Sequence, residues 1–210
     1  MTARTTRQLK QELIPVLREC AIAYDRLLCG NHAIMQCDSG LTVDILWGKE
    51  NFMHLCGVHC NRPQSMFRNK GPHPSEVMFF YDQLIAGRLS PDMLTIANDR
   101  LTQRKAKVLP LLARLESLDL KIVNTHATGL TLAVGDERFA VGLAPSGHKS
   151  RDTGEAVMFP RSLRSQSIWN LADGHTRIHV VETIRICRPS ISPPIPLPVI
   201  SDATDANATG

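Results

Sequence analysis

The stretch DLKIVNTHATGLTLAVGDERFAVGL, residues 119–143, decides the fold class of this 210-residue chain. Apolar and polar residues alternate through much of it with a period of two, which is the pattern of half-buried β-strands. Gly135-Asp136-Glu137 interrupts the pattern and is typical of a tight hairpin turn. The alternation predicts strands over Lys121–Asn124, Leu130–Val134 and Arg138–Leu143, and further strands over Ala156–Phe159 and Arg177–Cys187. Consecutive strands joined by such turns favour an antiparallel sheet.

Upstream of these strands the apolar residues mostly recur with a helical period. A first helix is predicted after Thr5 or Thr6, with apolar residues at spacings of three and four through Leu9, Leu13 and Leu17. A hairpin, Ala33–Cys37 and Leu41–Trp47, follows. Gly48 to Pro74 has no regular pattern and predicts a basic loop. Helices are predicted after Ser75, at Ser90-Pro91 and from Asp99. Helices and strands segregated in this way indicate an α+β fold.

The composition is that of an ordinary globular chain. Hydrophobic residues make up 43% and charged residues 21%, which excludes a largely disordered protein. No apolar run approaches the roughly 18–20 residues of a membrane helix, and the polar N-terminus is not a secretory signal. We therefore expect a cytoplasmic protein. A single domain is predicted over residues 1–188, followed by a Pro-rich flexible tail over 189–210.

The distribution of charge says more than the net charge of +4. Residues 60–110 hold eight basic and four acidic side chains, whereas residues 1–59 hold six of each. Such a basic surface could bind a polyanion, although an ordinary solvated face would look the same in the sequence. The sequence contains no nucleotide-binding glycine loop, no nucleophile elbow and no prominent paired carboxylates. Because paired carboxylates are not prominent, two-metal chemistry and glycoside hydrolysis lack their usual ligands and acids.

Six cysteines first indicate free thiols, buried apolar groups or metal ligands, because disulfides are rare in cytosolic proteins. Two groups of Cys and His could contribute to a zinc site. One group is Cys29, His32 and Cys37, and the other is Cys56, His59 and Cys60. Neither spacing matches a standard zinc knuckle, so buried core thiols are the alternative.

Two other segments could carry chemistry. His54 is flanked by apolar Phe52 and Leu55, and an imidazole held in this way could act as an acid or base near neutral pH. A structural histidine capping a turn is an equally good interpretation. In Phe159-Pro160-Arg161-Ser162-Leu163-Arg164, Arg161 could grip a phosphate and Ser162 could donate a hydrogen bond. An ordinary strand end is the alternative there.

The segment Asn51-Phe52-Met53-His54-Leu55-Cys56-Gly57-Val58 resembles the Phe-x-His-Leu-x-Gly-aliphatic signature of a phage-associated nuclease family. This is the barnase–EndoU–colicin–RelE-like family, phage family four. Other segments follow in the order expected of that family, over about residues 25–170. They are Phe79-Phe80-Tyr81, Leu89 to Leu94, a basic helix with Arg100 and Arg104, and Phe159 to Leu163. Cys56 and Cys60 are not part of the signature, and the last strand and the Pro-rich tail lie outside the resemblance.

The resemblance implies helices packed on a small antiparallel sheet and metal-independent cleavage of RNA without a cofactor. RNA supplies the nucleophile through its 2′-hydroxyl, so the protein needs a base, an acid and cations. His54 would be the acid or base, Arg104 and Arg161 would hold the phosphate, and Ser162 would orient it. The remaining candidates for binding the substrate are His59, which is also the reserve acid or base, Arg100, Lys105 and Arg164.

Two alternatives to a ribonuclease of phage, mobile-element or toxin type stay open at this point. One is a non-catalytic nucleic-acid-binding protein, and the other is a zinc-stabilised interaction domain. The candidate partners are RNA and a cognate inhibitor, and a membrane is not among them. RNA products with 2′,3′-cyclic ends would indicate the enzyme, and RNA retained without cleavage would indicate the binding protein. Stoichiometric zinc would indicate the interaction domain.

Overall fold

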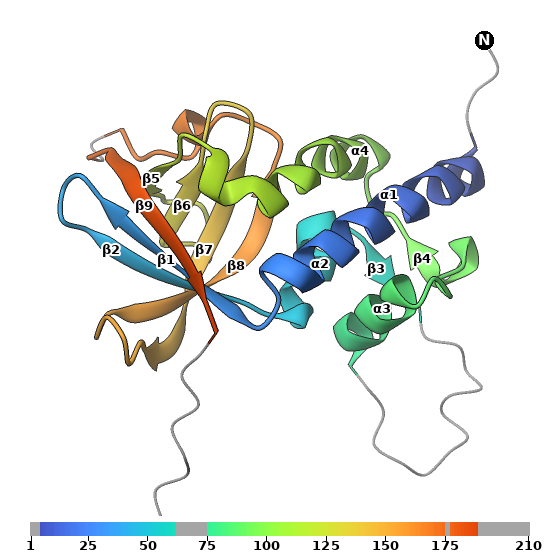
Figure 1. The fold of residues 1–210 in the computed structure, drawn as a ribbon. Coiled ribbons are helices and arrows are strands. Elements are labelled where there is room, and N and C mark those ends of the chain that lie inside the picture. The colour runs from blue at the N-terminus through green and yellow to red at the C-terminus, as the bar shows by residue number, and fades with distance from the viewer. Residues whose placement is uncertain (1–4, 62–74, 175–176, 189–210) are drawn as a thin grey trace, which may run out of the picture.

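The computed structural model describes residues 5–61, 75–174 and 177–188. It has two parts that lie side by side, a group of helices and a β-barrel (Figure 1). The helices are α1 (Thr6–Leu27), α2 (Lys49–Cys56), α3 (Glu76–Ile85) and α4 (Asp99–Val108), with 3₁₀ segments η2 (Pro91–Met93), η3 (Leu109–Ser117) and η4 (Ile168–Asn170). The strands are β1 (Asn31–Cys37), β2 (Thr42–Trp47), β3 (His59–Cys60), β4 (Leu94–Thr95), β5 (Lys121–Asn124), β6 (Leu132–Gly135), β7 (Ala140–Lys149), β8 (Ala156–Arg164) and β9 (His179–Cys187).

The long helix α1 is capped by Thr5, one of the two residues predicted to cap it, and Thr5 forms a capping box with Gln8. The side chain of Thr5 accepts a hydrogen bond from the backbone N–H of Gln8, and the Gln8 side chain accepts one from the N–H of Thr5. Every third or fourth side chain is buried, from Leu9 through Leu17 to Tyr24. This stripe packs α1 against the other helices and against η3. It therefore forms the spine of the helical part.

An aromatic cluster joins the helices in the core. The ring of Phe52 in α2 lies 4.9 Å from that of Tyr24 in α1 and 5.6 Å from that of Tyr81 in α3, measured between centroids. All three side chains are fully buried. The hydroxyls of the two tyrosines have hydrogen-bond partners, since Tyr24 donates to the carbonyl of Gly48 and Tyr81 donates to the carboxylate of Asp25. The cluster fixes the position of α2, which carries the most important candidate residue of the site.

Seven strands close into a barrel in the order β1-β2-β8-β7-β6-β5-β9, with β9 pairing again with β1. The pairs are antiparallel except β2 with β8, which run parallel. The α+β class is confirmed, but the prediction of a small antiparallel sheet is wrong. The physical reason is that β8 pairs with β7 on one side and with β2 on the other, while β9 bridges β5 and β1. Every barrel strand thus has two neighbours, which removes exposed sheet edges.

The loop predicted over Gly48 to Pro74 is wrong in its first part. Residues 49–56 form α2, and His59 and Cys60 form β3, which pairs with β4. Because α2 is short and buried on most sides, its sequence shows no helical stripe. The remainder of that predicted loop, residues 62–74, lies outside the described residues. The helix predicted from Asp99 begins there, capped by Asn98, and changes to 3₁₀ geometry at Leu109, next to Pro110.

The barrel strands follow the predicted segments closely, although β7 and β8 are each longer than expected. The single domain over 1–188 stays a prediction, and the tail over 189–210 lies outside the described residues. Within the described part of the chain, no helix is both long enough and apolar enough to cross a membrane.

Candidate functional site

His54 lies in the last turn of α2, with its side chain exposed to solvent. Its neighbours Met53 and Leu55 are buried and hold the helix against the core. The helix ends at Gly57, whose φ of 70° is left-handed and therefore suits glycine. A Cβ at Gly57 would also approach the Lys105 side chain to 2.8 Å. The backbone can thus turn beside His54 only because residue 57 has no side chain.

Helix α4 holds this end of α2 through two side chains. Lys105 donates from Nζ to the carbonyl of His54 over 3.2 Å, and Thr102 donates from Oγ1 to the carbonyl of Gly57 over 2.9 Å. Lys105 is only 8% exposed. A cation at a helix C-terminus is favourable, because the last carbonyls carry partial negative charge. Burial nevertheless lowers the pKa of Lys105, and the charge of Arg164 lowers it further, while Cys56 acts in the opposite direction.

A β-bulge places Arg161. In the register between β7 and β8, Gly142 pairs with Ser162 and Leu143 pairs with Pro160, so Arg161 falls between the two pairs. Pro160 is tolerated there because a bulge does not need every N–H. The Arg161 side chain is exposed, and its Nη1 would lie 3.5 Å from a Cβ at Gly129. Its guanidinium therefore lies beside the turn at Gly129, and its charge is felt at His54.

The electrostatic surroundings of His54 favour its neutral form. Partial burial lowers the pKa of His54 below the ordinary 6.5, and the charges of His59, Lys105 and Arg161 lower it further. The carboxylate of Glu76 acts in the opposite direction but is outweighed. A neutral imidazole at pH 7 can accept a proton, which a general base must do. A bound phosphate would raise this pKa again, because it would offset the neighbouring cations.

His59 follows α2 in the short strand β3 and is also exposed. Its Nδ1 lies 3.7 Å from Oε1 of Glu76, at the start of α3. The same Oε1 accepts a hydrogen bond of 2.8 Å from the backbone N–H of Cys60, which fixes the carboxylate. Glu76 thus places a carboxylate close to the ring of His59, and the charge of His59 is in turn felt at His54.

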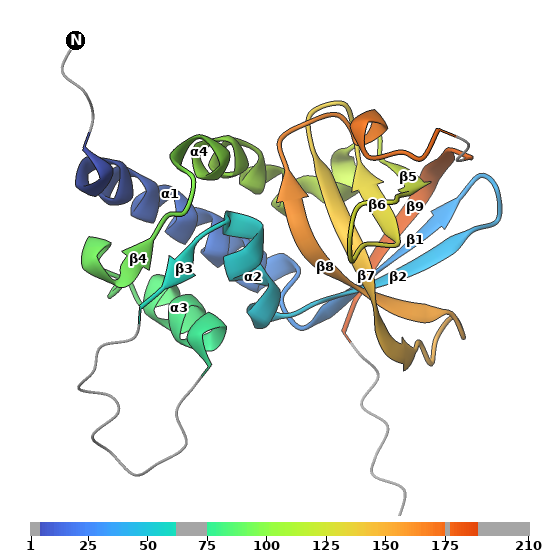
Figure 2. The same cartoon turned by 180° about the vertical axis from the view of Figure 1, so that it is seen from behind.

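Beside Lys105 the surface is hollowed between α4 and the end of β8. This pocket has a volume of about 340 Å³. Its lining includes Leu101, Arg104 and Lys105 from α4, and Arg164, Ser165 and Gln166 from the end of β8 and the residues after it. Figure 2 shows α2, α4 and β8 meeting on this side of the molecule. Two expected residues, Arg104 and Arg164, therefore lie in one pocket, and Lys105 connects that pocket to His54.

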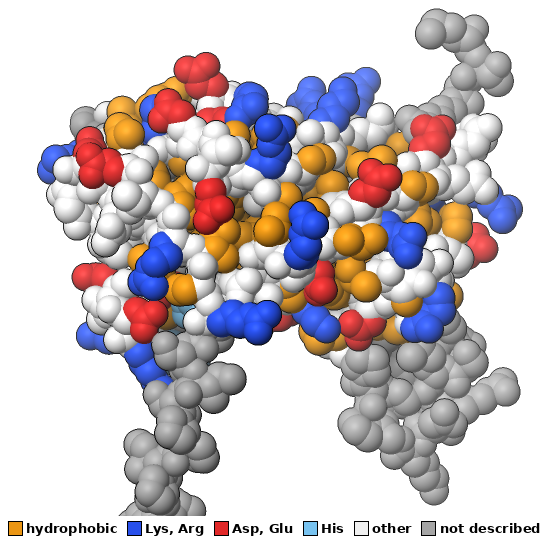
Figure 3. Space-filling view, in the orientation of Figure 1, with side chains coloured by type: hydrophobic (Ala, Val, Ile, Leu, Met, Phe, Trp, Pro, Cys, Tyr) orange, Lys and Arg blue, Asp and Glu red, His pale blue; other side chains and the backbone are white. Residues whose placement is uncertain are grey.

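Arg100 and Ser162 occupy different positions from those expected. Arg100 lies one turn before Arg104 on the exposed start of α4 and is not among the residues that line the pocket. Lys and Arg side chains gather over α4 in the space-filling view (Figure 3). Ser162 is among the residues that line the pocket, but its Oγ is buried and has no hydrogen-bond partner within the described chain. The role expected for this hydroxyl at a phosphate stays a prediction.

The cysteines do not form a metal site with the residues described. All six are free, and Cys20, Cys37, Cys56 and Cys60 are buried. Across 5–61, 75–174 and 177–188, no three side chains of His, Cys, Asp or Glu are grouped so that they could hold a metal ion. Burial raises the pKa of the Cys60 thiol to about 11, and the charge of Glu76 raises it further. The two zinc groups considered from the sequence are therefore not assembled.

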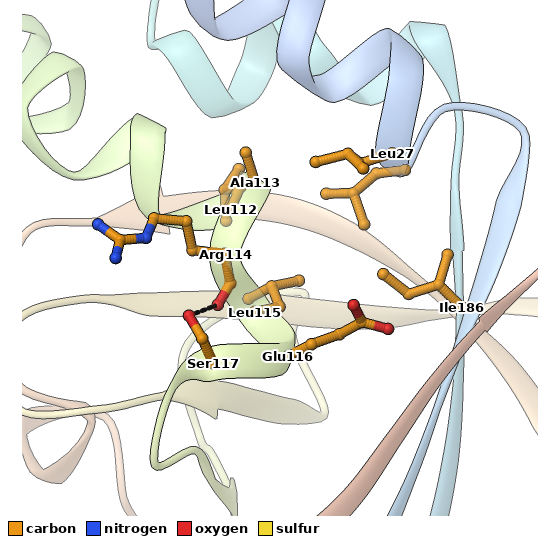
Figure 4. A pocket seen from close by; sticks show the side chains of 9 residues that line it. Leu27, Leu112, Ala113, Arg114, Leu115, Glu116, Ser117 and Ile186 are labelled. Atoms are coloured by element: carbon orange, nitrogen blue, oxygen red, sulfur yellow. Dashed lines mark hydrogen bonds between the residues drawn. The ribbon is translucent and has the colours of Figure 1, made fainter.

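A second hollow lies on another part of the molecule, where the end of α1, η3 and β9 meet. It has a volume of about 210 Å³ and is lined largely by Leu27, Leu28, Leu112, Leu115 and Ile186. Figure 4 shows the guanidinium of Arg114 pointing away from Leu27 and Ile186. This hollow is apolar and has no histidine in its lining, so it is a poorer candidate for phosphate chemistry than the surface around His54.

Sequence reasoning did not identify several residues that shape the site. Thr102 donates to the carbonyl of Gly57, and Gly129 leaves room for the guanidinium of Arg161. Glu76 lies beside the ring of His59. Their signal was weak, since Thr, Gly and Glu are common on surfaces. Leu101, Ser165 and Gln166 became candidates only because the fold brings α4 to the end of β8.

The comparisons with known proteins bear on the same surface. A family model described as phage-Barnase-EndoU-ColicinE5/D-RelE like nuclease4 matches residues 16–146. Comparisons with curated proteins and with solved structures gave no match. The matched region contains His54, His59 and all of α4, whereas Arg161 and Arg164 lie beyond it. Because the match covers more than half of the chain, this protein belongs to the phage-Barnase-EndoU-ColicinE5/D-RelE like nuclease4 family.

Proposed function

We propose that this member of a nuclease family is an endoribonuclease that cleaves RNA through attack of the 2′-hydroxyl on the adjacent phosphate. The observation that carries the proposal is the exposed imidazole of His54, whose pKa is lowered by partial burial and by nearby cations that include Lys105 and Arg161. An unprotonated base next to two cations is the arrangement that this reaction needs.

We assign one proton transfer to each of the two histidines. A ring nitrogen of His54 takes the proton of the 2′-hydroxyl, and the 2′-oxygen bonds to phosphorus. The bond from phosphorus to the 5′-oxygen then breaks, and a protonated His59 gives its proton to that oxygen. The products are a 2′,3′-cyclic phosphate and a free 5′-hydroxyl, and His54 and His59 exchange their protonation states. Glu76 supports His59 by orienting its ring.

The cations stabilise the charge that builds up on phosphorus. The guanidinium of Arg161 is exposed and can donate two parallel hydrogen bonds to the phosphate oxygens. Lys105 is already partly desolvated, so its charge interacts strongly with a nearby anion. Positive groups that are in place before the substrate arrives need little reorganisation during the reaction.

An oligodeoxynucleotide that contains one ribonucleotide tests the proposal. We expect cleavage only after the ribonucleotide, in buffer with EDTA, with a 2′,3′-cyclic phosphate on the product. The substitution His54→Ala should reduce the rate by about 10²–10⁴-fold, the usual contribution of general acid–base catalysis. The matched control is His148→Ala, which removes another exposed histidine in β7.

Each result of this assay has a clear meaning. Cleavage of an all-deoxy strand, or equal rates for the parent and His54→Ala, would refute the assignment. Binding of RNA without cleavage would instead favour the non-catalytic nucleic-acid-binding function. Expression in bacteria tests the proposals of a toxin-type role and of action in the cytoplasm. Expression of the parent should arrest growth, and expression of His54→Ala should not. Control by a cognate inhibitor is a further proposal, and co-expression of such an inhibitor should restore growth.

A further inference from the structure

We infer that the pocket between α4 and β8 is a subsite for one nucleotide beside the phosphodiester that is cleaved. In it, Arg104 and Arg164 hold a neighbouring phosphate, and Leu101 and Gln166 contact the base. This inference rests on the proposed ribonuclease function, which it extends from the cleaved bond to the adjoining nucleotide.

The pocket lies beside the end of α2 that carries His54. The side chain of Lys105 lines the pocket and also donates to the carbonyl of His54 over 3.2 Å. The charge of Arg164 in turn lowers the pKa of Lys105, so these two cations lie near each other. Arg164 follows Arg161 by three residues along β8, which corresponds to about 10 Å of extended strand. A strand of RNA whose phosphate contacts Arg161 would therefore have its next residue near this pocket.

The charge and size of the pocket select the kind of ligand. Three of its lining residues are cationic, and no Asp or Glu is among the described residues that line it. Its volume of about 340 Å³ is at the lower end of ligand pockets, so it can hold a single nucleotide but not a duplex. A buried lysine among its walls, 8% exposed, strengthens the pull on an anion because little water screens it.

Two further side chains suit a nucleobase. Leu101 is 46% exposed, although leucines prefer to be buried, and it lies three residues before Arg104 on the same side of α4. Its apolar surface can cover the face of a base. Gln166 offers one acceptor and two donors, which can hydrogen-bond to the edge of an unpaired base. A single-stranded nucleotide satisfies both features together with the cations.

The test uses binding and not cleavage, so that it is independent of catalysis. Fluorescently labelled oligodeoxynucleotides of two and three residues, which lack the 2′-hydroxyl, are titrated into the full chain. The trinucleotide extended on one side should bind about tenfold more tightly than the dinucleotide, because its extra phosphate adds one hydrogen bond to a charged group. In Arg104→Gln and Arg164→Gln most of this gain should be lost, and the slope of log affinity against log salt should fall by about 0.7 for each lost phosphate contact.

Lys107→Gln is the matched control, because Lys107 is an exposed cation of the same helix that does not line the pocket. Arg164→Lys keeps the charge but loses the two-pronged contact, so it should bind with intermediate affinity. The inference is overturned if Arg104→Gln and Arg164→Gln lose no more affinity than Lys107→Gln. If the chain cuts RNA through His54 in that case, the proposed function stands without the subsite. If the affinity gain depends on both arginines but no RNA is cut, the nucleotide pocket stands and the proposed function fails.

Discussion

Replacing Lys105 by methionine should separate catalysis from stability. The Nζ of Lys105 donates to the carbonyl of His54 over 3.2 Å, and a structural role alone would make this contact important for holding the end of α2. However, the same carbonyl also accepts from the backbone N–H of Gly57 over 3.2 Å, so it keeps a partner when the lysine is removed. Methionine has a similar length and volume and fills the same space.

The magnitude follows from two opposing contributions. Loss of a hydrogen bond from a charged donor costs about 1.5–3 kcal/mol. The ammonium is only 8% exposed and burial lowers its pKa, so removing it also recovers a desolvation penalty that is typically several kcal/mol. We therefore expect the free energy of unfolding of Lys105→Met to change by less than about 1 kcal/mol, because the two contributions nearly cancel. The rate of RNA cleavage should fall by about 10- to 100-fold, since stabilisation of the phosphorane by this cation is lost.

The assay combines urea unfolding with initial rates on the single-ribonucleotide substrate. Thr102→Val is the matched control, because Thr102 donates to the carbonyl of Gly57 over 2.9 Å but carries no charge. That variant should lose about 1–3 kcal/mol of stability by leaving a carbonyl unpaired, while its cleavage rate changes only a few-fold. A Lys105→Met variant that is strongly destabilised but cuts RNA normally would refute the reasoning, since Lys105 would then be only a clamp on α2.

Three more predictions concern the core, the pH dependence and the β6–β7 turn. Phe52→Ala should lower the free energy of unfolding by about 3–5 kcal/mol, because it removes the ring that lies between Tyr24 and Tyr81; a loss below about 1 kcal/mol in urea unfolding would contradict this packing. The acid limb of the pH profile of kcat/KM should lie below pH 6.5, because the pKa of His54 is lowered and protonation at lower pH removes the base; a limb above that value would disagree with the electrostatics. Burial by itself raises the pKa of Asp136, but hydrogen bonds from the side chain and backbone of Arg138 and from the backbone of Phe139 outweigh it and lower that pKa below 3.8. Asp136→Asn should therefore be less stable than the parent by about 1–3 kcal/mol at neutral pH. A carboxylate with a lowered pKa contributes stability that is present above pH 3.8 and is lost as the pH falls through its pKa in the folded protein. The difference in the free energy of unfolding between the parent and Asp136→Asn should therefore shrink in acid. If urea titrations show the same difference at every pH, Asp136 does not have this role.

The sequence allowed most elements to be predicted, because their signals are local. The capping box at Thr5, the turn at Gly135 and the alternation over Lys121–Asn124 each depend on residues close together in the chain. Helix α2 was missed because it has only 8 residues, and about two turns are too short to show a helical period. His54 was nevertheless a candidate there, first from its apolar neighbours and then from the resemblance of the segment to a family signature.

The site itself was only partly predictable. His54, Lys105, Arg104, Arg161 and Arg164 were all candidates, but nothing local showed which of them meet. The side chain of Ser162 was expected at the phosphate and is instead sealed from solvent. Leu101 and Gln166 had no signal before α4 and the end of β8 were seen to form one pocket.

By itself, the sequence determined the α+β class, the hairpins, most helix and strand segments and the basic, histidine-containing segment that points to a nuclease. Only the tertiary structure decided that the sheet closes into a barrel, that β2 runs parallel to β8, and that a bulge in β8 falls at Arg161. The physical reason is the range of the interactions. Periodicity reports which side of a segment is buried, whereas the partner of a strand depends on packing between residues more than a hundred positions apart, as for Asp44 and Val157.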